Sequence, residues 1–337
     1  MYLPEHPLPT PPKRYVSTGT LPADSAVARL IERAHSEYRE NVDGQLSGVY
    51  PVLAGADPDQ FGLAIADVGG AVHSVGDAAV EFTLMSVSKP FVFALVSEVL
   101  GIGAVRKRVG VNPTGLPFNS ASAVERSRAG RTNPMVNAGA IATTSLVPGS
   151  NPDARWAWLA DGISRFAGHK LELDVETLAS ARATNFRNRA LAMLLKESEA
   201  LDGDPLAAVD LYTMQCSLNV NATDLAIMGA TLAAGGVNPL TGERVVGTAV
   251  ARATLAVMSI AGLYEGSGEW LLDVGFPAKT GISGGLVAVS PGKGALASFS
   301  PLLDEDGNSV RGQLAARALA VELGLDLFAA VPAQTDV

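Results

Sequence analysis

The spacing of apolar residues along the chain predicts where helices and strands lie. From Ala23 onward, apolar positions recur every three to four residues and charged residues occupy the other positions, which predicts an amphipathic helix. Its apolar face consists of Val27, Leu30, Ile31 and Ala34. The preceding residues 1–22 are rich in proline and lack periodicity, so we expect a tail outside the folded part.

Short apolar runs near both ends of the chain have the character of β-hairpins. Residues 61–67 and 71–75 flank a Val-Gly-Gly turn, and residues 285–289 and 295–299 flank a turn with proline and two glycines. A helix-like stretch over 311–323 follows the second pair. We therefore expect two hairpins and a terminal helix.

The middle of the chain, from Ser88 to about Met258, is mostly helical in pattern, with loops rich in Gly, Pro and Asn. Its clearest segments are 94–100, 191–195 and 224–232. The simplest architecture is of the α/β (α+β) class: an antiparallel sheet from both chain ends, flanked by helices, with a helical lobe inserted between its halves. The cleft should lie between the lobes.

The chain has 337 residues, a length at which large α/β enzymes often form one catalytic unit. We expect one catalytic domain over residues 23–337. Its sheet lobe would span about 23–87 and 259–337, and its helical lobe about 88–258. Hydrophobic residues make up 47% and charged residues 18%, which is typical of a globular protein and excludes a disordered chain.

Charge and residue usage exclude several classes of partner. The formal net charge of −9 disfavours nucleic acid and anionic membranes, and no run of about 18 apolar residues predicts a membrane span. One cysteine, Cys216, cannot form an internal disulfide, and the four histidines lack metal-ligand spacing. The N-terminus lacks a basic stretch followed by an apolar run. We expect a cytoplasmic protein without metal or other cofactor.

Ser86 and Lys89 form a Ser-x-x-Lys motif, followed by Pro90. If a helix begins near Ser86, the serine hydroxyl and the lysine amine share a face, and proline is tolerated in the first turn. A lysine partly removed from water has a lowered pKa and can accept the serine proton. The motif alone is weak evidence, because Ser-x-x-Lys more often marks a helix N-terminus with a solvated lysine.

A second motif, Lys279-Thr280-Gly281, lies directly ahead of the late hairpin. It resembles the Lys-Thr-Gly strand motif that accompanies Ser-x-x-Lys in penicillin-recognising serine enzymes, and Gly281 would let backbone N–H groups approach an oxyanion. The order and spacing of the two motifs agree with that fold.

Further sequence blocks resemble the signature blocks of bacterial and mitochondrial glutaminases, in family order from about Asp43 to Leu327. The blocks are residues 112–120, 133–141, 212–217, 235–242 and 275–281. The resemblance implies the fold of β-lactamases and DD-peptidases, no cofactor, a small-molecule substrate and a homodimer or homotetramer. It implies hydrolysis of L-glutamine to L-glutamate and ammonia through a serine acyl-enzyme.

The resemblance also implies roles for individual residues. Ser86 matches the nucleophile and Lys89 its activating lysine. The residues that match substrate-binding positions are Asn137, Asn188, Tyr212, Tyr264 and Ile282, the last through a backbone N–H in the oxyanion hole. The resemblance implies a catalytic role for the two tyrosines as well. Apart from the resemblance, the asparagines could be helix caps or turn formers and the tyrosines half-buried core residues. We expect Cys216 to be a packed thiol.

Three positions depart from the family pattern. Val49 stands where the family has a tyrosine, Met85 where it has a glutamine, and Ala181 where it has a glutamate that faces the substrate ammonium. Asn185 or Tyr50 could replace the lost contacts. An apolar floor at Val49, Met85 and Ala181 could instead favour a capped or acylated substrate. Two alternatives to a glutaminase therefore stay open: a serine amidohydrolase of the same fold with another substrate, and a catalytically weak protein that binds a metabolite.

Overall fold

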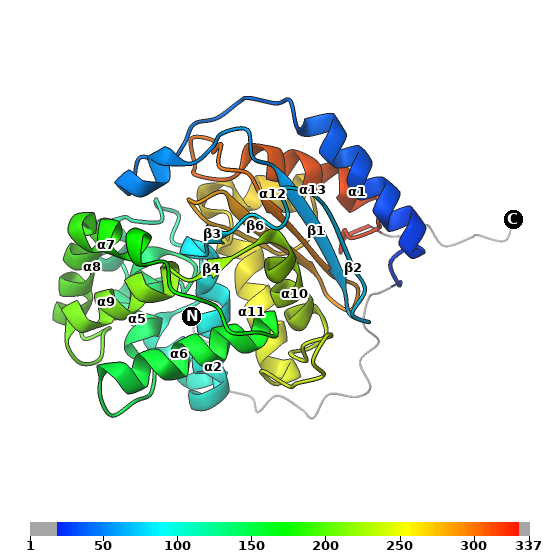
Figure 1. Cartoon of the computed structure of the whole chain (residues 1–337). Coiled ribbons are helices and arrows are strands. Elements are labelled where there is room, and N and C mark those ends of the chain that lie inside the picture. Colours follow the sequence, from blue (N-terminus) through cyan, green and yellow to red (C-terminus); the bar gives the residue numbers. More distant parts are fainter. Residues whose placement is uncertain (1–18, 330–337) are drawn as a thin grey trace, which may run out of the picture.

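The computed structural model describes residues 19–329 and is built around one antiparallel sheet (Figure 1). Its strand order is β2-β1-β7-β6-β5. The strands are β1 (Gly62–Asp67), β2 (Val72–Gly76), β5 (Ala278–Thr280), β6 (Gly285–Ser290) and β7 (Gly294–Phe299). Strands from both chain ends meet where β1 pairs with β7. Both hairpins and the sheet made from the two ends are thus confirmed.

The two faces of the sheet pack against different helices because strand residues alternate in direction. Leu63 and Ile65 point toward α1 (Asp24–Tyr38) and α13 (Val310–Glu322). Ala64 and Ala66 point toward α10 (Ala222–Ala233), whose place on the opposite side is visible in Figure 1. A side chain at Gly229 of α10 would come within 2.5 Å of Ala295, so glycine permits this close packing.

The predicted helices at both ends of the chain are present. In α1, Val27, Ile31 and Ala34 are buried, whereas Leu30 is only partly buried. The helix α13 includes the predicted stretch up to Glu322 and contributes Leu319 to the same core. The predicted tail lies mostly outside the described residues.

A group of helices stands beside the sheet (Figure 1). Its central member is α2 (Ser88–Leu100), whose residues from Ser88 to Ser97 are all buried. The remaining helices of this group are α3 (Ile102–Val109), α4 (Ala121–Glu125), α5 (Asn137–Ser145), α6 (Pro152–Ala167), α7 (Val175–Thr184), α8 (Phe186–Glu197), α9 (Pro205–Cys216) and α11 (Thr248–Ala261). The helix α12 (Ser267–Asp273) contributes Trp270 to the core that α1 and α13 share. The division into two lobes of one domain stays a prediction.

Short elements connect the sheet to the helices. A two-stranded sheet joins β3 (Phe82–Thr83) to β4 (Asn219–Val220). The single-turn 3₁₀ helices are η1 (Pro51–Gly55), η2 (Met85–Val87), η3 (Arg128–Gly130) and η4 (Tyr264–Gly266). The prediction of a helix near Ser86 needs one correction: the α-helix begins at Ser88, and Ser86 lies in the 3₁₀ turn η2 that precedes it.

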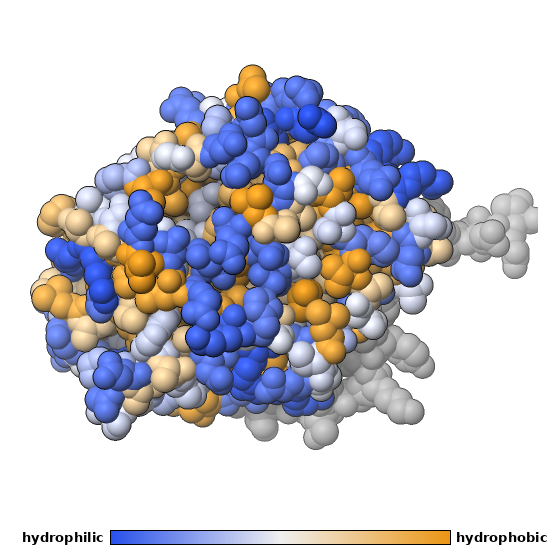
Figure 2. Space-filling view, viewed as in Figure 1, coloured by the Kyte–Doolittle hydropathy of each residue, from blue (hydrophilic) through white to orange (hydrophobic). Residues whose placement is uncertain are grey.

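Polar and small apolar areas are interspersed on the face of the molecule shown in Figure 2. Within residues 19–329 no helix is both long enough and apolar enough to cross a bilayer.

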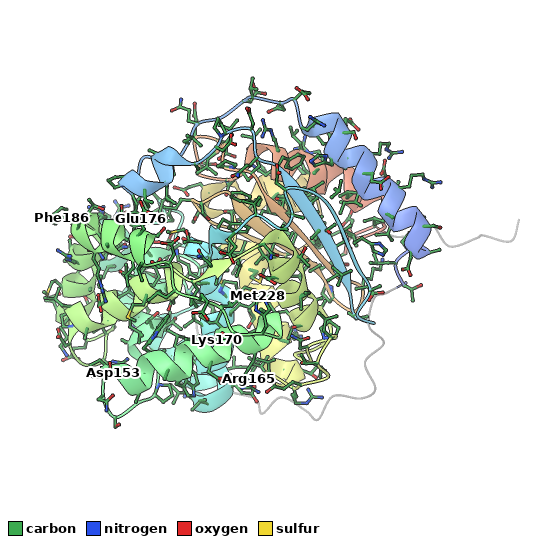
Figure 3. All side chains as sticks on the ribbon, in the orientation of Figure 1. Asp153, Arg165, Lys170, Glu176, Phe186 and Met228 are labelled. Carbon is green, nitrogen blue, oxygen red and sulfur yellow. The ribbon has the colours of Figure 1, made fainter. Side chains whose placement is uncertain are left out.

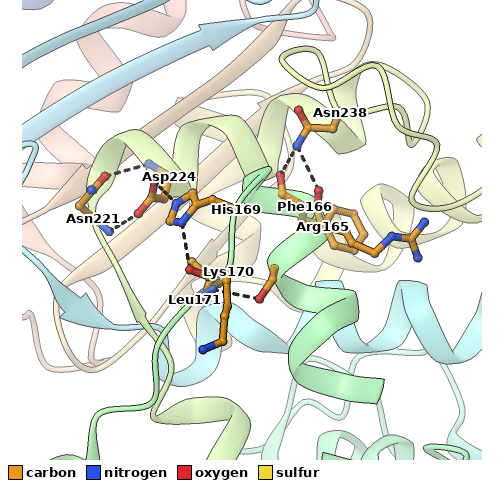
Figure 4. A network of polar contacts seen from close by, with 9 residues as sticks. Arg165, Phe166, His169, Lys170, Leu171, Asn221, Asp224 and Asn238 are labelled. Carbon is orange, nitrogen blue, oxygen red and sulfur yellow. Dashed lines mark hydrogen bonds and ion pairs between the residues drawn. The ribbon is translucent and has the colours of Figure 1, made fainter. Parts of the chain in front are cut away.

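The start of α10 is held by a reciprocal pair of hydrogen bonds (Figure 4). Asn221 Oδ1 accepts from the Asp224 N–H at 2.9 Å, and Asp224 Oδ2 accepts from the Asn221 N–H at 3.2 Å. His169 Nε2 lies 2.8 Å from the other Asp224 oxygen, which ties the loop after α6 to this cap. The arrangement satisfies N–H groups that the first helical turn cannot pair by itself.

We expect Asn221→Ala to lower the free energy of unfolding by about 1 to 2 kcal/mol, because α10 loses its cap. Urea denaturation followed by circular dichroism measures this change. Asn151→Ala is the matched control, because Asn151 caps the exposed start of α6 with a single bond to the Ala154 N–H. Its expected cost is about 0.5 to 1 kcal/mol. An equal or smaller loss for Asn221→Ala would contradict the importance of this cap.

Candidate active site

Ser86 lies in a tight turn between β3 and α2 that the surrounding side chains hold in place. The preceding residue, Met85, has a φ of 44°, a value that non-glycine residues rarely adopt. The Ser88 hydroxyl donates to the Met85 carbonyl at 2.7 Å and accepts from Gln215 Nε2 at 3.2 Å. The turn therefore presents Ser86, which is 8% exposed, to a cavity at a fixed position.

Lys89 is buried beside this turn, and within residues 19–329 none of its hydrogen-bond partners is a carboxylate. Its Nζ donates to Asn137 Oδ1 at 2.7 Å and lies 3.3 Å from the Met135 carbonyl. Burial lowers the pKa of Lys89 to about 7. A neutral lysine amine has two N–H donors and one lone pair. These two acceptors can occupy both donors, so the lone pair remains to accept a proton.

Asn137 connects Lys89 to the opposite wall of the cavity. Its Oδ1 accepts from Lys89, and its Nδ2 donates to Asn188 Oδ1 at 3.0 Å. The Tyr212 hydroxyl also lies 3.5 Å from Asn137 Oδ1. These contacts join α2, α5, α8 and α9, so four predicted site residues are brought together across 123 residues of sequence.

The two predicted tyrosines are buried phenols. Burial raises the pKa of Tyr264 to about 12 and raises that of Tyr212 well above its usual range. Among the described residues the Tyr264 hydroxyl has no partner within hydrogen-bond distance, although the nearby Ser86 and Thr280 side chains lower its pKa. Both phenols are therefore protonated at neutral pH, and Tyr264 is next to the predicted nucleophile.

The Lys279-Thr280-Gly281 motif lies against the Ser86 turn. A side chain at Gly281 would come within 2.9 Å of the Leu84 carbonyl and 3.3 Å of Met85 Cβ, so glycine allows the end of β5 to approach the turn. Lys279 Nζ donates to the carbonyls of Gly262 and Thr280 at 2.8 and 2.7 Å. Burial, aided by Lys89, holds the pKa of Lys279 well below its usual range.

A cavity of about 100 Å³ opens between these elements. Its wall is formed by Val49, Tyr50, Met85, Ser86, Phe118, Asn119, Asn137, Thr184, Asn185, Arg187, Asn188, Tyr212, Cys216 and Ile282. Five of the seven predicted site residues thus line one cavity, whereas Lys89 and Tyr264 are buried and are not among its lining residues. The catalytic and substrate-binding roles assigned to these residues stay predictions.

Comparison with known proteins agrees with this arrangement of motifs. The family model described as Glutaminase matches residues 44–328. The chain belongs to the glutaminase family. It is 56% identical to Glutaminase 2 of Yersinia pestis over 318 residues, which cover 94% of each chain. It is 46% identical to a glutaminase of Brucella suis biovar 1 (strain 1330), covering 91% of this chain and 96% of the relative.

Solved glutaminase structures have the same fold. A structure described as the probable glutaminase ybaS matches with a TM-score of 0.89 at 43% identity, covering 90% of this chain and 99% of that one. The probable glutaminase of Bacillus subtilis matches with a TM-score of 0.83 at 32% identity, covering 90% and 98%. The predicted fold class, shared with the β-lactamases, is confirmed for this member of the family.

One expectation about the glutaminase cavity needs correction. Val49 and Met85 line it as expected, whereas Ala181, a buried residue of α7, is not among the lining residues. The sequence reading also gave no role to Phe118 and Asn119, which line the cavity. Their only signal was their place in the block 112–120.

We expect the reactivity of Ser86 toward a small serine-directed phosphonylating reagent to rise with pH through about 7, because Lys89 accepts a proton only in its neutral form. The second-order labelling rate, measured by mass spectrometry from about pH 5 to 9, checks this. Lys89→Met should react slowly and without this rise. A rate for the unaltered protein that is constant across this range would contradict the assignment of Lys89.

Proposed function

We propose that this protein hydrolyses the side-chain amide of L-glutamine to L-glutamate and ammonia through an acyl-enzyme on Ser86. The observation that carries the proposal is the buried Lys89 amine, whose pKa is about 7 and whose two acceptors leave its lone pair available for the Ser86 proton. The membership of this chain in the glutaminase family supports the choice of glutamine as substrate.

In the acylation step, Ser86 Oγ attacks the amide carbonyl carbon while Lys89 Nζ takes the hydroxyl proton. Negative charge develops on the carbonyl oxygen, and the backbone N–H groups of Ser86 and Ile282 are the proposed donors that stabilise it. The C–N bond then breaks, the leaving nitrogen receives the proton, and ammonia departs. Tyr264, a protonated phenol beside Ser86, is the proposed relay for this proton.

Deacylation reverses these roles with water as the nucleophile. Lys89 takes a proton from water, hydroxide oxygen bonds to the ester carbon, and Ser86 Oγ leaves with the proton. Because Asn137 contacts both Lys89 and Asn188, it can hold the base and the substrate in one geometry. Asn188 and Tyr212, which line the other side of the cavity, are the proposed contacts to the main-chain end of glutamine.

The assembly and location of the protein are part of the same proposal. We propose a homodimer or homotetramer in the cytoplasm, supported by the family resemblance and by the acidic net charge of −9, which disfavours association with anionic membranes. Light scattering after size-exclusion chromatography tests the assembly.

We expect Ser86→Ala to lower the rate of ammonia release from L-glutamine by about 10⁴-fold or more, because no acyl-enzyme can form. Lys89→Ala should lower kcat by about 10²- to 10⁴-fold through loss of the base. The measurement is steady-state ammonia release with each variant. Ser259→Ala is a control, because this serine bonds only within α11 to the Leu255 carbonyl. Turnover by Ser86→Ala close to that of the unaltered protein would contradict the proposal.

A further inference from the structure

A buried glutamine of α9, Gln215, is connected by hydrogen bonds to the turn that presents Ser86. Its side chain is 0% exposed and is not among the described residues that line the cavity. Its Nε2 donates to Ser88 Oγ at 3.2 Å. The Ser88 hydroxyl gives its one proton to the Met85 carbonyl at 2.7 Å, so it can only accept from the amide. These two bonds fix the direction of the Gln215 amide.

The other end of this amide is held by α5. Gln215 Oε1 can only accept, and it accepts from the Thr144 hydroxyl at 3.0 Å. Thr144, Gln215 and Ser88 are all fully buried, so no water replaces a partner that one of them loses. The chain of bonds therefore ties the Ser86 turn to α5 and α9, the two helices that also carry Asn137 and Tyr212.

The turn needs this support because Met85 has a φ of 44°. Such a conformation persists in a non-glycine residue only when its surroundings hold it. The Met85 carbonyl accepts from both the backbone N–H and the hydroxyl of Ser88. Without the Gln215 donor, the Ser88 hydroxyl is free to rotate toward Cys216 Sγ, which lies 3.9 Å away. The carbonyl then loses one donor, and the turn that sets the place of Ser86 relaxes.

We propose that Gln215 is a positioning residue for the nucleophile: it orients the Ser88 hydroxyl and thereby keeps the Met85 turn in the conformation that presents Ser86 to the cavity. This inference rests on the proposed function, in which Ser86 attacks the substrate. Because Gln215 does not line the cavity, it acts on Ser86 through Ser88 and not through contact with the substrate.

The reactivity of Ser86 toward the phosphonylating reagent tests the inference. Gln215→Met keeps a long unbranched side chain but removes the donor. We expect it to lower the second-order labelling rate by about 10- to 100-fold, because a small displacement of a nucleophile is costly. The factor should be the same from about pH 5 to 9, since the variant changes no charge beside Lys89. A shifted pH midpoint would overturn the inference, because Gln215 would then act on Lys89.

A double-variant comparison shows whether the effect passes through Ser88. Ser88→Ala should lower the labelling rate by a similar factor. Adding Gln215→Met to Ser88→Ala should change the rate by less than about threefold, because no hydroxyl remains to be oriented. Losses that multiply in the double variant would overturn the inference.

Thr144→Val gives a second, milder route to the same result, because it keeps the side-chain shape and leaves Gln215 in place. It should lower the labelling rate by about three- to tenfold, since Gln215 Oε1 loses its donor. Labelling of Thr144→Val at the rate of the unaltered protein would overturn the inference, even if Gln215→Met failed to fold.

Thr231→Val is the matched control for a lost buried hydrogen bond. Thr231 lies on α10, the helix on which Met228 is labelled in Figure 3, and its hydroxyl contacts only the carbonyls of Ile227 and Phe166. Urea denaturation should show that this variant is destabilised, whereas its labelling rate should stay within about twofold of the unaltered protein. A loss of labelling as large as that of Gln215→Met would overturn the inference, because lower stability alone would explain both.

Steady-state kinetics separate this inference from the proposed function. With L-glutamine, Gln215→Met should lower kcat by about 10- to 100-fold and change KM by less than about threefold, because the cavity wall is unaltered. If labelling of Ser86 depends on Gln215 but the unaltered protein releases no ammonia, the proposed function is wrong and the positioning role stands. Labelling that does not depend on Gln215 overturns the positioning role, whether or not ammonia is released.

Discussion

The proposed chemistry depends on the burial of Lys89, which has no carboxylate partner in the part of the chain that the structure describes. A buried ammonium group is costly unless it is paired with a negative charge, and the lysine avoids the cost by losing its proton. Its pKa of about 7 follows from that burial, and Asn137 and Met135 satisfy its two remaining N–H groups. Lys279, a second buried lysine, is driven toward its neutral form by burial and by Lys89.

The architecture explains how these groups are held together. Ser86 and Lys89 come from the junction of η2 and α2, whereas Lys279 lies on β5 at the edge of the main sheet. Two glycines allow β5 to lie close to the Ser86 turn and to the backbone before Tyr264. Gly281 brings the end of β5 against the Ser86 turn, and Gly262 allows the backbone before Tyr264 to approach β5, where an added side chain would come within 1.7 Å of the Ala278 carbonyl.

The hairpins and the two lysine motifs could be predicted from the sequence, because turn residues and short spacings are local signals. The hydrogen bond between Lys89 and Asn137 could not be predicted from residue spacing, because that contact depends on how α5 packs beside α2. The 3₁₀ turn at Ser86 was also missed, since it needs a positive φ at Met85 that tertiary contacts stabilise. Likewise, the direction of the Gln215 amide is set by Ser88, 127 residues away.

The most direct test of the Ser86–Lys89 assignment is to trap the acyl-enzyme. The protein is mixed with L-glutamine, quenched in acid within milliseconds and digested, and the peptide containing Ser86 is analysed by mass spectrometry. We expect a glutamyl ester on Ser86 that forms faster as pH rises through about 7 and is absent in Ser86→Ala. Ammonia released at the normal rate with no ester on Ser86, or with an ester on another residue, would contradict the assignment.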